Sequence, residues 1–149
     1  MTKKSVTLLV AAILLAATYV YYFTDWINPP IIQIIAQVRP YTMAARAGTS
    51  LGVVFTLDHK YSLNTIKVVP VSALATNRNP APLWYLVKNT NSVPVHGFAY
   101  GARIRGMRPA VPKTGPEPLE PGKEYRLYVA SGRAKGQIDF RTAGPPANN

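Results

Sequence analysis

The chain has 149 residues, no cysteine, 17 Lys and Arg and six Asp and Glu, which gives a formal net charge of +11. The lack of cysteine excludes disulfide bonds, cysteine nucleophiles, thiolate metal sites, covalent haem attachment and lipid attachment at cysteine. The positive charge predicts an anionic neighbour, such as lipid headgroups, a polyanion or an acidic face on another subunit.

An uncharged apolar segment, residues 5–23, contains neither Pro nor Gly. As a helix it would be about 28 Å long, close to the hydrocarbon thickness of a bilayer. Because two lysines precede it, a secretory signal peptide is the alternative interpretation. A cut after Ala17 would place Leu15 where a small residue is preferred, and the apolar run continues well beyond that point. We therefore expect an uncleaved anchor, with residues 1–23 forming the cytoplasmic N-terminus and a transmembrane helix.

The residues on either side of this segment predict its orientation. Lys3 and Lys4 precede it, whereas Asp25 follows it and the next basic residue is Arg39. Positive charge stays on the cytoplasmic side, so we expect the C-terminal domain outside the inner (cytoplasmic) membrane, in the periplasm of a Gram-negative cell. The small residues expected to pack the helix against a partner and the aromatic residues expected at the interface are Ala11, Ala12, Ala16, Ala17, Tyr19, Tyr21, Tyr22 and Trp26.

Residues 24–30 are expected to form a short hinge, because their Asn-Pro-Pro end cannot continue a helix. Residues 31–38 are rich in β-branched side chains and predict a first strand. A short interfacial helix is the alternative. Its apolar stripe, at helical spacing, would consist of Ile31, Ile34, Ile35 and Val38.

The remaining sequence alternates short β-rich stretches with turn residues. Residues 58–60 should end one strand, and residues 71–75 could extend another past Pro70. Residues 102–108 should continue in extended form or bulge at the glycines before a Pro-rich loop over 109–122. About seven strands with frequent turn signals, and no soluble helix, predict an all-β sandwich with Trp84 facing inward. The strands after the first are expected at residues 53–57, 61–69, 83–87, 95–100, 124–129 and 136–142. In residues 124–129 alternation should turn Tyr125, Leu127 and Val129 one way and Tyr128 the other, and in residues 61–69 it should turn Lys67 away from the face of Ile66 and Val68.

Two stretches near the end of the chain resemble fibronectin type III and related immunoglobulin-like domains. Residues 119–129 carry the pattern Leu-x-Pro-Gly-x-x-Tyr-x-Leu-x-Val, and residues 140–142 carry Phe-x-Thr. In those domains the first pattern forms a turn and the penultimate strand, and the second ends the last strand. The resemblance implies an antiparallel immunoglobulin-like β-sandwich over residues 31–142 and a role in adhesion, docking or spacing. It implies no active site, because the fold hosts many functions; residues 143–149 should form a flexible tail.

Few residues point to chemistry. His59, His96 and the six acids are scattered, whereas a metal site needs three or four converging ligands. The sequence contains no Gly-x-Ser-x-Gly elbow, phosphate loop or Gly-x-Gly-x-x-Gly motif. We therefore expect no enzymatic activity, cofactor or nucleic-acid partner. The densest basic group is either a solvated face or a docking surface for acidic headgroups or an acidic subunit, and it consists of Arg103, Arg105, Arg108 and Lys113.

Together these features predict a non-catalytic accessory subunit of a larger membrane complex of the respiratory, photosynthetic or transport type. Its expected partners are integral-membrane subunits and membrane lipid. The alternative is a stand-alone anchored module that binds an anionic envelope polymer or lipid headgroups, with an affinity that falls with salt. An anchored enzyme would require a pocket with convergent polar groups.

Overall fold

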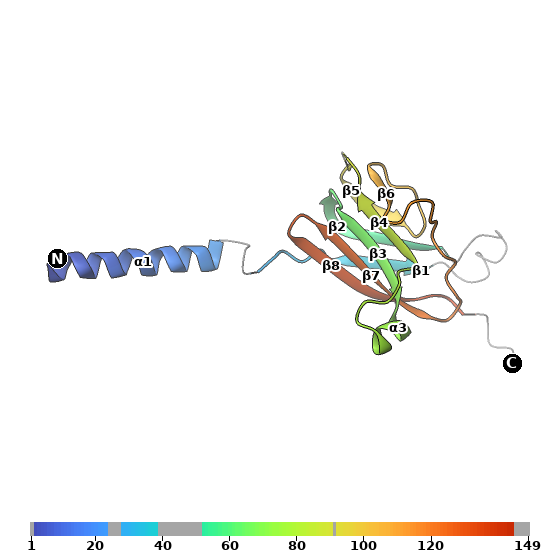
Figure 1. Ribbon diagram of the computed structural model, residues 1–149, viewed down its shortest axis with the longest axis horizontal. Coiled ribbons are helices and arrows are strands. Elements are labelled where there is room, and N and C mark those ends of the chain that lie inside the picture. Colours follow the sequence, from blue (N-terminus) through green and yellow to red (C-terminus); the bar gives the residue numbers. More distant parts are fainter. Residues whose placement is uncertain (1, 24–27, 39–51, 91, 145–149) are drawn as a thin grey trace. The chain divides into compact units, whose positions relative to one another are not determined.

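A computed structural model describes residues 2–23, 28–38, 52–90 and 92–144. The chain divides into two compact units, residues 1–30 and residues 31–149. Within the described ranges, the first unit holds helix α1 (Lys3–Phe23), and the second holds eight strands and a short helix, α3 (Figure 1).

Helix α1 confirms the prediction of one continuous apolar helix. It runs for 21 residues, and none of its side chains is buried by the rest of the described chain. Its two threonines satisfy their hydroxyls within the helix, since Thr7 donates to the Lys3 carbonyl at 3.0 Å and Thr18 to the Leu14 carbonyl at 2.8 Å. The helix is long and apolar enough to cross a membrane.

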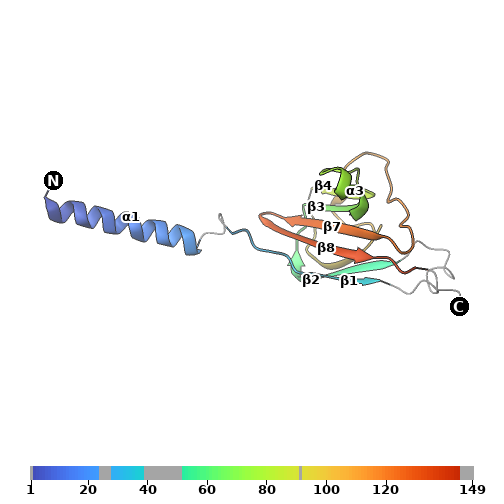
Figure 2. The same ribbon diagram turned by 90° about the horizontal axis from the view of Figure 1, so that it is seen from below.

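The second unit consists of two antiparallel sheets. One has the strand order β1-β2-β5, and the other β6-β4-β3-β7-β8. Figure 2 shows the two layers, with β7 and β8 in one and β1 and β2 in the other. The strands are β1 (Ile34–Val38), β2 (Val53–Tyr61), β3 (Thr65–Pro70), β4 (Trp84–Lys88), β5 (Val95–Ala99), β6 (Met107–Pro109), β7 (Glu124–Ser131) and β8 (Ala134–Arg141). Strand β1 confirms the strand predicted within residues 31–38. The alternative for these residues, a short interfacial helix, is wrong.

An aromatic cluster joins the two sheets. Phe55 of β2 lies 5.4 Å from Phe98 of β5 and 5.1 Å from Phe140 of β8, measured between ring centroids. Trp84 of β4 is buried and lies 6.0 Å from Phe98, which confirms that it faces inward. Alternation along the strands supplies the rest of this core, because every second side chain points between the sheets. Accordingly Tyr125, Leu127 and Val129 of β7, predicted to point the same way, are all buried.

The start of this unit links the two sheets before β1 begins. Ile31 forms a parallel bridge with Lys135 of β8, and the Ile32 N–H donates to the Lys135 carbonyl at 2.9 Å. The chain then joins β2 of the other sheet as β1. The crossing is close because Gly136 has no side chain: a Cβ there would lie 2.5 Å from the Ile32 carbonyl oxygen.

Three local expectations are wrong. Residues 58–60 do not end a strand but belong to β2, with exposed side chains, and an irregular register lets β2 pair again at Tyr61. Residues 71–75 do not extend β3: they form helix α3 (Val71–Thr76), because Pro70 has no N–H to continue the ladder and good helix formers follow it. The described chain therefore contains a short helix in addition to α1.

The third correction concerns residues 102–108, which do not continue in extended form: residues 105–106 form a turn, and residues 107–108 begin β6. Gly101 and Gly106 have φ angles of 78° and 81°, a conformation that other residues rarely adopt, so the chain reverses at both positions. Only β6 pairs with the sheet, against β4.

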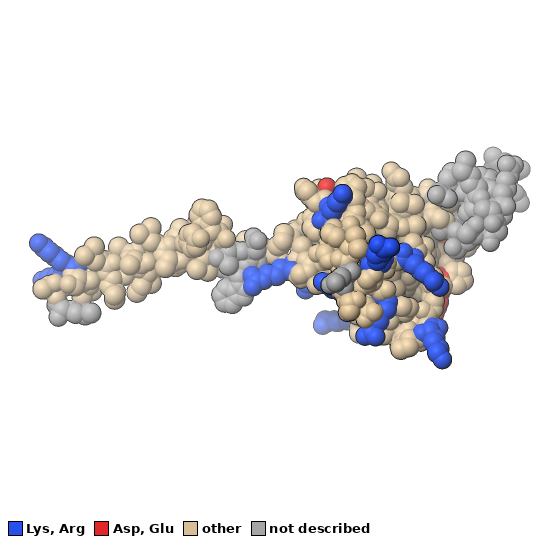
Figure 3. Space-filling model, turned by 90° about the horizontal axis from the view of Figure 1, so that it is seen from above, with Lys and Arg blue, Asp and Glu red and all other residues tan. Residues whose placement is uncertain are grey.

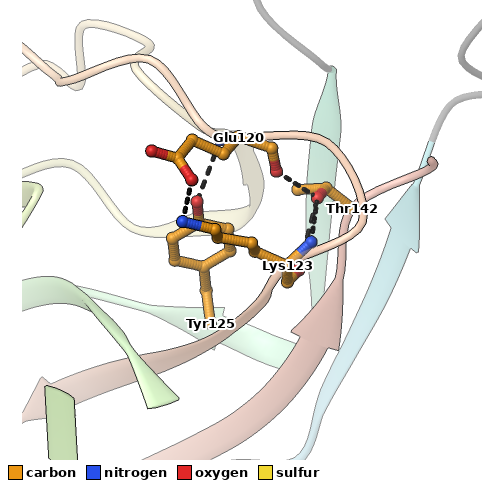
Figure 4. A network of polar contacts seen from close by, with 4 residues as sticks. All are labelled: Glu120, Lys123, Tyr125 and Thr142. Carbon is orange, nitrogen blue, oxygen red and sulfur yellow. Dashed lines mark hydrogen bonds and ion pairs between the residues drawn. The ribbon is translucent and has the colours of Figure 1, made fainter. Parts of the chain in front are cut away.

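A polar network holds the turn that carries the Leu-x-Pro-Gly-x-x-Tyr pattern (Figure 4). The Glu120 N–H donates to the Tyr125 hydroxyl at 2.9 Å, and the buried Thr142 hydroxyl donates to the Glu120 carbonyl at 2.5 Å. The Lys123 ammonium forms an ion pair with the Glu120 carboxylate. The Lys123 backbone N–H donates to the Thr142 hydroxyl oxygen at 3.2 Å. Gly122 makes the turn with a φ of 72°. The network ties the start of β7 to the end of β8, so these groups have a structural role.

Candidate binding surface

A groove lies on the outer face of the five-stranded sheet. Its volume is about 660 Å³, which is within the range of small-molecule sites. Most of its lining is apolar or aromatic, and among the described residues it contains two lysines and no acid. The lining residues are Ile31, Thr65, Lys67, Tyr85, Tyr128, Val129, Ala130, Lys135, Gly136 and Gln137.

Strand register explains how these side chains meet. Ile66 and Val68 of β3 are fully buried, so Lys67 between them points outward. Lys67 lies opposite Tyr85 of β4 on one side and opposite Tyr128 of β7 on the other. The register thus places one cation between two tyrosines.

A second row runs parallel to the first. Ala130 of β7 lies opposite Thr65 on one side and Lys135 of β8 on the other. Ile31 reaches this row through its bridge to Lys135, and its exposed fraction is 78%, so a large apolar side chain stands at the groove edge. This second row therefore adds another cation and an exposed aliphatic group to the surface.

The lysines of the groove have no acidic partner among the described residues. The Lys67 ammonium donates to the Asn79 side-chain oxygen at 3.0 Å and lies 5.8 Å from the Tyr85 ring centroid. The ion pairs of the described chain join other residues, so neither Lys67 nor Lys135 is neutralised. On the same sheet, Arg126 binds Asp139 in a bidentate manner at 2.5 and 2.8 Å. That hydrogen bonding lowers the pKa of Asp139, and it leaves this carboxylate engaged by its own cation.

The predicted basic group is exposed, but it does not form part of the groove. Arg108 lies on edge strand β6, opposite Val87 of β4, whereas Arg103 and Arg105 precede β6 and Lys113 follows it. None of the four takes part in an ion pair within the described ranges. Figure 3 shows Lys and Arg side chains spread over one face of the β unit, with little acid among them.

The helix residues are all exposed where they are described. Helical geometry of about 100° per residue places Ala12 and Ala16 on one face, whereas Ala11 and Ala17 project about 120° to either side of it. The four alanines therefore do not share one stripe. Tyr19 stacks on Phe23 at 5.2 Å, and the Tyr21 and Tyr22 rings meet edge to face at 5.2 Å. Trp26 lies outside the described residues.

The two histidines lie on neighbouring strands, β2 and β5. His59 contacts Asp58 at 2.9 Å, and the Tyr61 hydroxyl donates to the same carboxylate at 3.3 Å. Burial by itself would raise the pKa of Asp58, but these hydrogen bonds outweigh it and hold the pKa below its ordinary value. His96 is an exposed residue of β5. Within the described ranges, no group of three or more His, Asp or Glu could hold a metal ion.

Sequence reasoning missed the groove, although it placed Lys67 and Tyr128 on opposite faces from the core residues next to them. The missing information was the register across β3, β4, β7 and β8, which no local pattern contains.

Comparisons with protein-family models, curated proteins and solved structures found no match to this chain.

Proposed function

We propose that the protein is a non-catalytic, single-pass accessory subunit of a larger membrane complex of the respiratory, photosynthetic or transport type. The observation that carries this proposal is the state of α1: its 21 residues are almost wholly apolar, and none of them is buried within the part of the chain that the structure describes. Such a helix needs lipid or other membrane helices around it. The β unit has a core of its own, so it can serve as a rigid docking element.

The proposed orientation places the N-terminus in the cytoplasm and the β unit in the periplasm. Lys3 and Lys4 at the start of α1 support it, because positive charge stays on the cytoplasmic side. Tyr19, Tyr21 and Tyr22 near the other end suit the membrane–water interface, where a ring can lie in lipid and its hydroxyl in water.

We further propose that the β unit is of the immunoglobulin or fibronectin type III kind. In that architecture strands A, B and E share one sheet and C, F and G the other, and here β1, β2 and β5 oppose a sheet containing β3, β7 and β8. A tyrosine near the start of strand F characteristically bonds to the backbone a few residues upstream. Tyr125, the second residue of β7, does so with Glu120. Trp84 departs from the pattern, because it lies on β4 rather than on the strand in the C position.

Affinity purification from native membranes in mild detergent, at low and high salt, tests the accessory role. We expect defined integral-membrane subunits to co-purify with the chain and to remain bound at high salt. Recovery of the chain as a free monomer from native membranes would contradict the proposal.

A pair of variants tests whether α1 makes the contact with the co-purified membrane subunits. Replacing Ala12 and Ala16 with Leu adds bulk to the face on which two small residues lie one turn apart, and should lower the yield of co-purified subunits. Replacing Ala11 and Ala17 with Leu makes the same chemical change on other faces and serves as the control. Equal loss in both variants would exclude a specific Ala12–Ala16 contact.

A second candidate function, a stand-alone module for an anionic envelope polymer or lipid headgroups, is favoured by the exposed basic group. Arg103, Arg105, Arg108 and Lys113 have no described ion-pair partner, so they remain available to phosphate or carboxylate. Binding of this kind should weaken steeply with salt. Purification of the chain with lipid alone, which is lost at high salt, would favour this function over the accessory role.

A further inference from the structure

The groove on the five-stranded sheet has the chemistry of a site for an amphiphilic anion. Tyr85, Tyr128 and Ile31 offer apolar surface, and Lys67 and Lys135 offer positive charge without any acid among the described lining residues. A free phosphate ion would leave the tyrosines and Ile31 uncovered, and a neutral hydrocarbon would leave the two ammonium groups without a counter-charge. A molecule with an anionic head next to an apolar body satisfies both.

The two lysines can serve a single anionic group. Lys67 is on β3 and Lys135 is two strands away on β8, one row further along. Strand spacings of about 4.8 Å and a rise of about 3.3 Å per residue put their Cα atoms roughly 12 Å apart. Their flexible four-carbon stems can therefore converge over β7, the strand between them. Lys67 uses only one of its three N–H donors on Asn79, so two remain for a ligand.

The covalent chain limits how far the groove edge can be from the end of α1. Seven residues, 24–30, separate Phe23 from Ile31, and Ile31 itself lines the groove. At no more than about 3.5 Å per residue, the two Cα atoms are at most about 28 Å apart. Any α1 that spans a bilayer thus keeps Ile31 within a short tether of the lipid headgroups.

We propose that this groove binds an anionic phospholipid of the surrounding membrane. Lys67 and Lys135 hold the headgroup phosphate, and the apolar part of the lipid covers Ile31, Tyr85 and Tyr128. The inference goes beyond the accessory role and rests only on its membrane-spanning helix. It applies whether the chain works in a complex or alone.

A lipid titration of the purified full-length chain in mild detergent tests the site by native mass spectrometry. We expect phosphatidylglycerol to bind more tightly than phosphatidylcholine. Replacing Lys67 and Lys135 with Gln should weaken the phosphatidylglycerol complex roughly 30-fold, the effect expected of two lysines near anionic lipid. Lys60→Gln with Lys88→Gln removes the same charge from exposed positions that belong neither to the groove nor to the basic group, and is the matched control. Equal weakening in both double variants would overturn the proposal, because the affinity for phosphatidylglycerol would then depend only on the net charge of the chain.

A cross-linking measurement locates the lipid, since α1 also attracts lipid in detergent. Phosphatidylglycerol with a photoreactive group in an acyl chain should label peptides that contain Ile31, Tyr85 or Tyr128. Labelling confined to α1 would refute the groove as the site. Equal thermal unfolding of the wild type and the lysine variant shows that the variant is folded; if it is not, the cross-linked positions in the wild type still decide.

Two competitors separate the lipid from other anions. Inorganic phosphate that displaces phosphatidylglycerol at an equal concentration would show that the apolar part contributes nothing, and polyglutamate that binds in a Lys67-dependent manner while the lipid does not would assign the groove to an acidic polypeptide. Either result would overturn the lipid proposal. The titration uses the isolated chain, so failure to find a partner complex in native membranes leaves its outcome unaffected.

Discussion

Replacing Gly136 with Ala adds one methyl group at the place where the chain crosses between the two sheets. The added Cβ would lie 2.5 Å from the Ile32 carbonyl oxygen and 2.9 Å from the Ile32 Cβ, and the first of these is backbone that cannot rotate away. The contact should push the Ile31–Ile32 segment off β8 and break the 2.9 Å hydrogen bond from the Ile32 N–H to Lys135. Overpacking of about 1–3 kcal/mol and a lost hydrogen bond of about 1 kcal/mol together predict a destabilisation of about 2–4 kcal/mol.

Thermal unfolding of the full-length chain in detergent, followed by circular dichroism in the β region, measures this effect. At about 4 °C per kcal/mol for a domain of this size, the variant should unfold roughly 10 °C below the wild type. Gly115→Ala is the matched control, because a Cβ there meets nothing within 4 Å. It should leave stability unchanged or slightly higher, as expected where the added methyl only restricts the unfolded chain. Equal midpoints for the two variants would refute the close crossing at Gly136.

Three further predictions concern the same unit. Gly97→Ala should destabilise the fold by about 1–3 kcal/mol in urea unfolding, because its Cβ would lie 2.7 Å from a β2 carbonyl oxygen; wild-type stability would contradict the β2–β5 register. Tyr125→Phe should cost about 1 kcal/mol in the same assay, because the Glu120 N–H loses its acceptor; no change would mean that the hydroxyl is dispensable. Asp139→Asn should cost less than about 1 kcal/mol at neutral pH, since the carboxylate is 38% exposed. Arg126 lowers the pKa of that carboxyl in the folded state, so its contribution is present above the ordinary aspartate pKa of about 4 and disappears as the pH falls through the lowered value. Unfolding curves of the variant and the wild type should therefore converge in acid, and a constant difference down to pH 2 would contradict this reasoning.

Features that depend on near neighbours along the chain could be predicted from the amino-acid sequence alone. The apolar run of α1 needs no tertiary partner to be recognised, because length and hydrophobicity alone match a bilayer. Alternation in residues 124–129 predicted that Tyr125, Leu127 and Val129 share one face, since a strand turns successive side chains to opposite faces, and all three are buried. The Pro-Gly turn before β7 was also predicted. Gly122 has the left-handed conformation that glycine adopts much more readily than other residues.

Where local signals were weak or opposed by distant contacts, the tertiary structure decided. Polar residues such as Asp58 suggest the end of a strand, but the Asp58 N–H donates to the Gln33 carbonyl at 3.1 Å and β2 continues. Past Pro70 the ladder to β7 stops, and the chain forms α3 instead of more strand. The groove depends both on alternation along each strand and on the pairing between strands. Its outward side chains follow from alternation, but only the pairing of β3 with β4 and β7 brings Lys67 between Tyr85 and Tyr128, because register is set by contacts between residues far apart in the sequence.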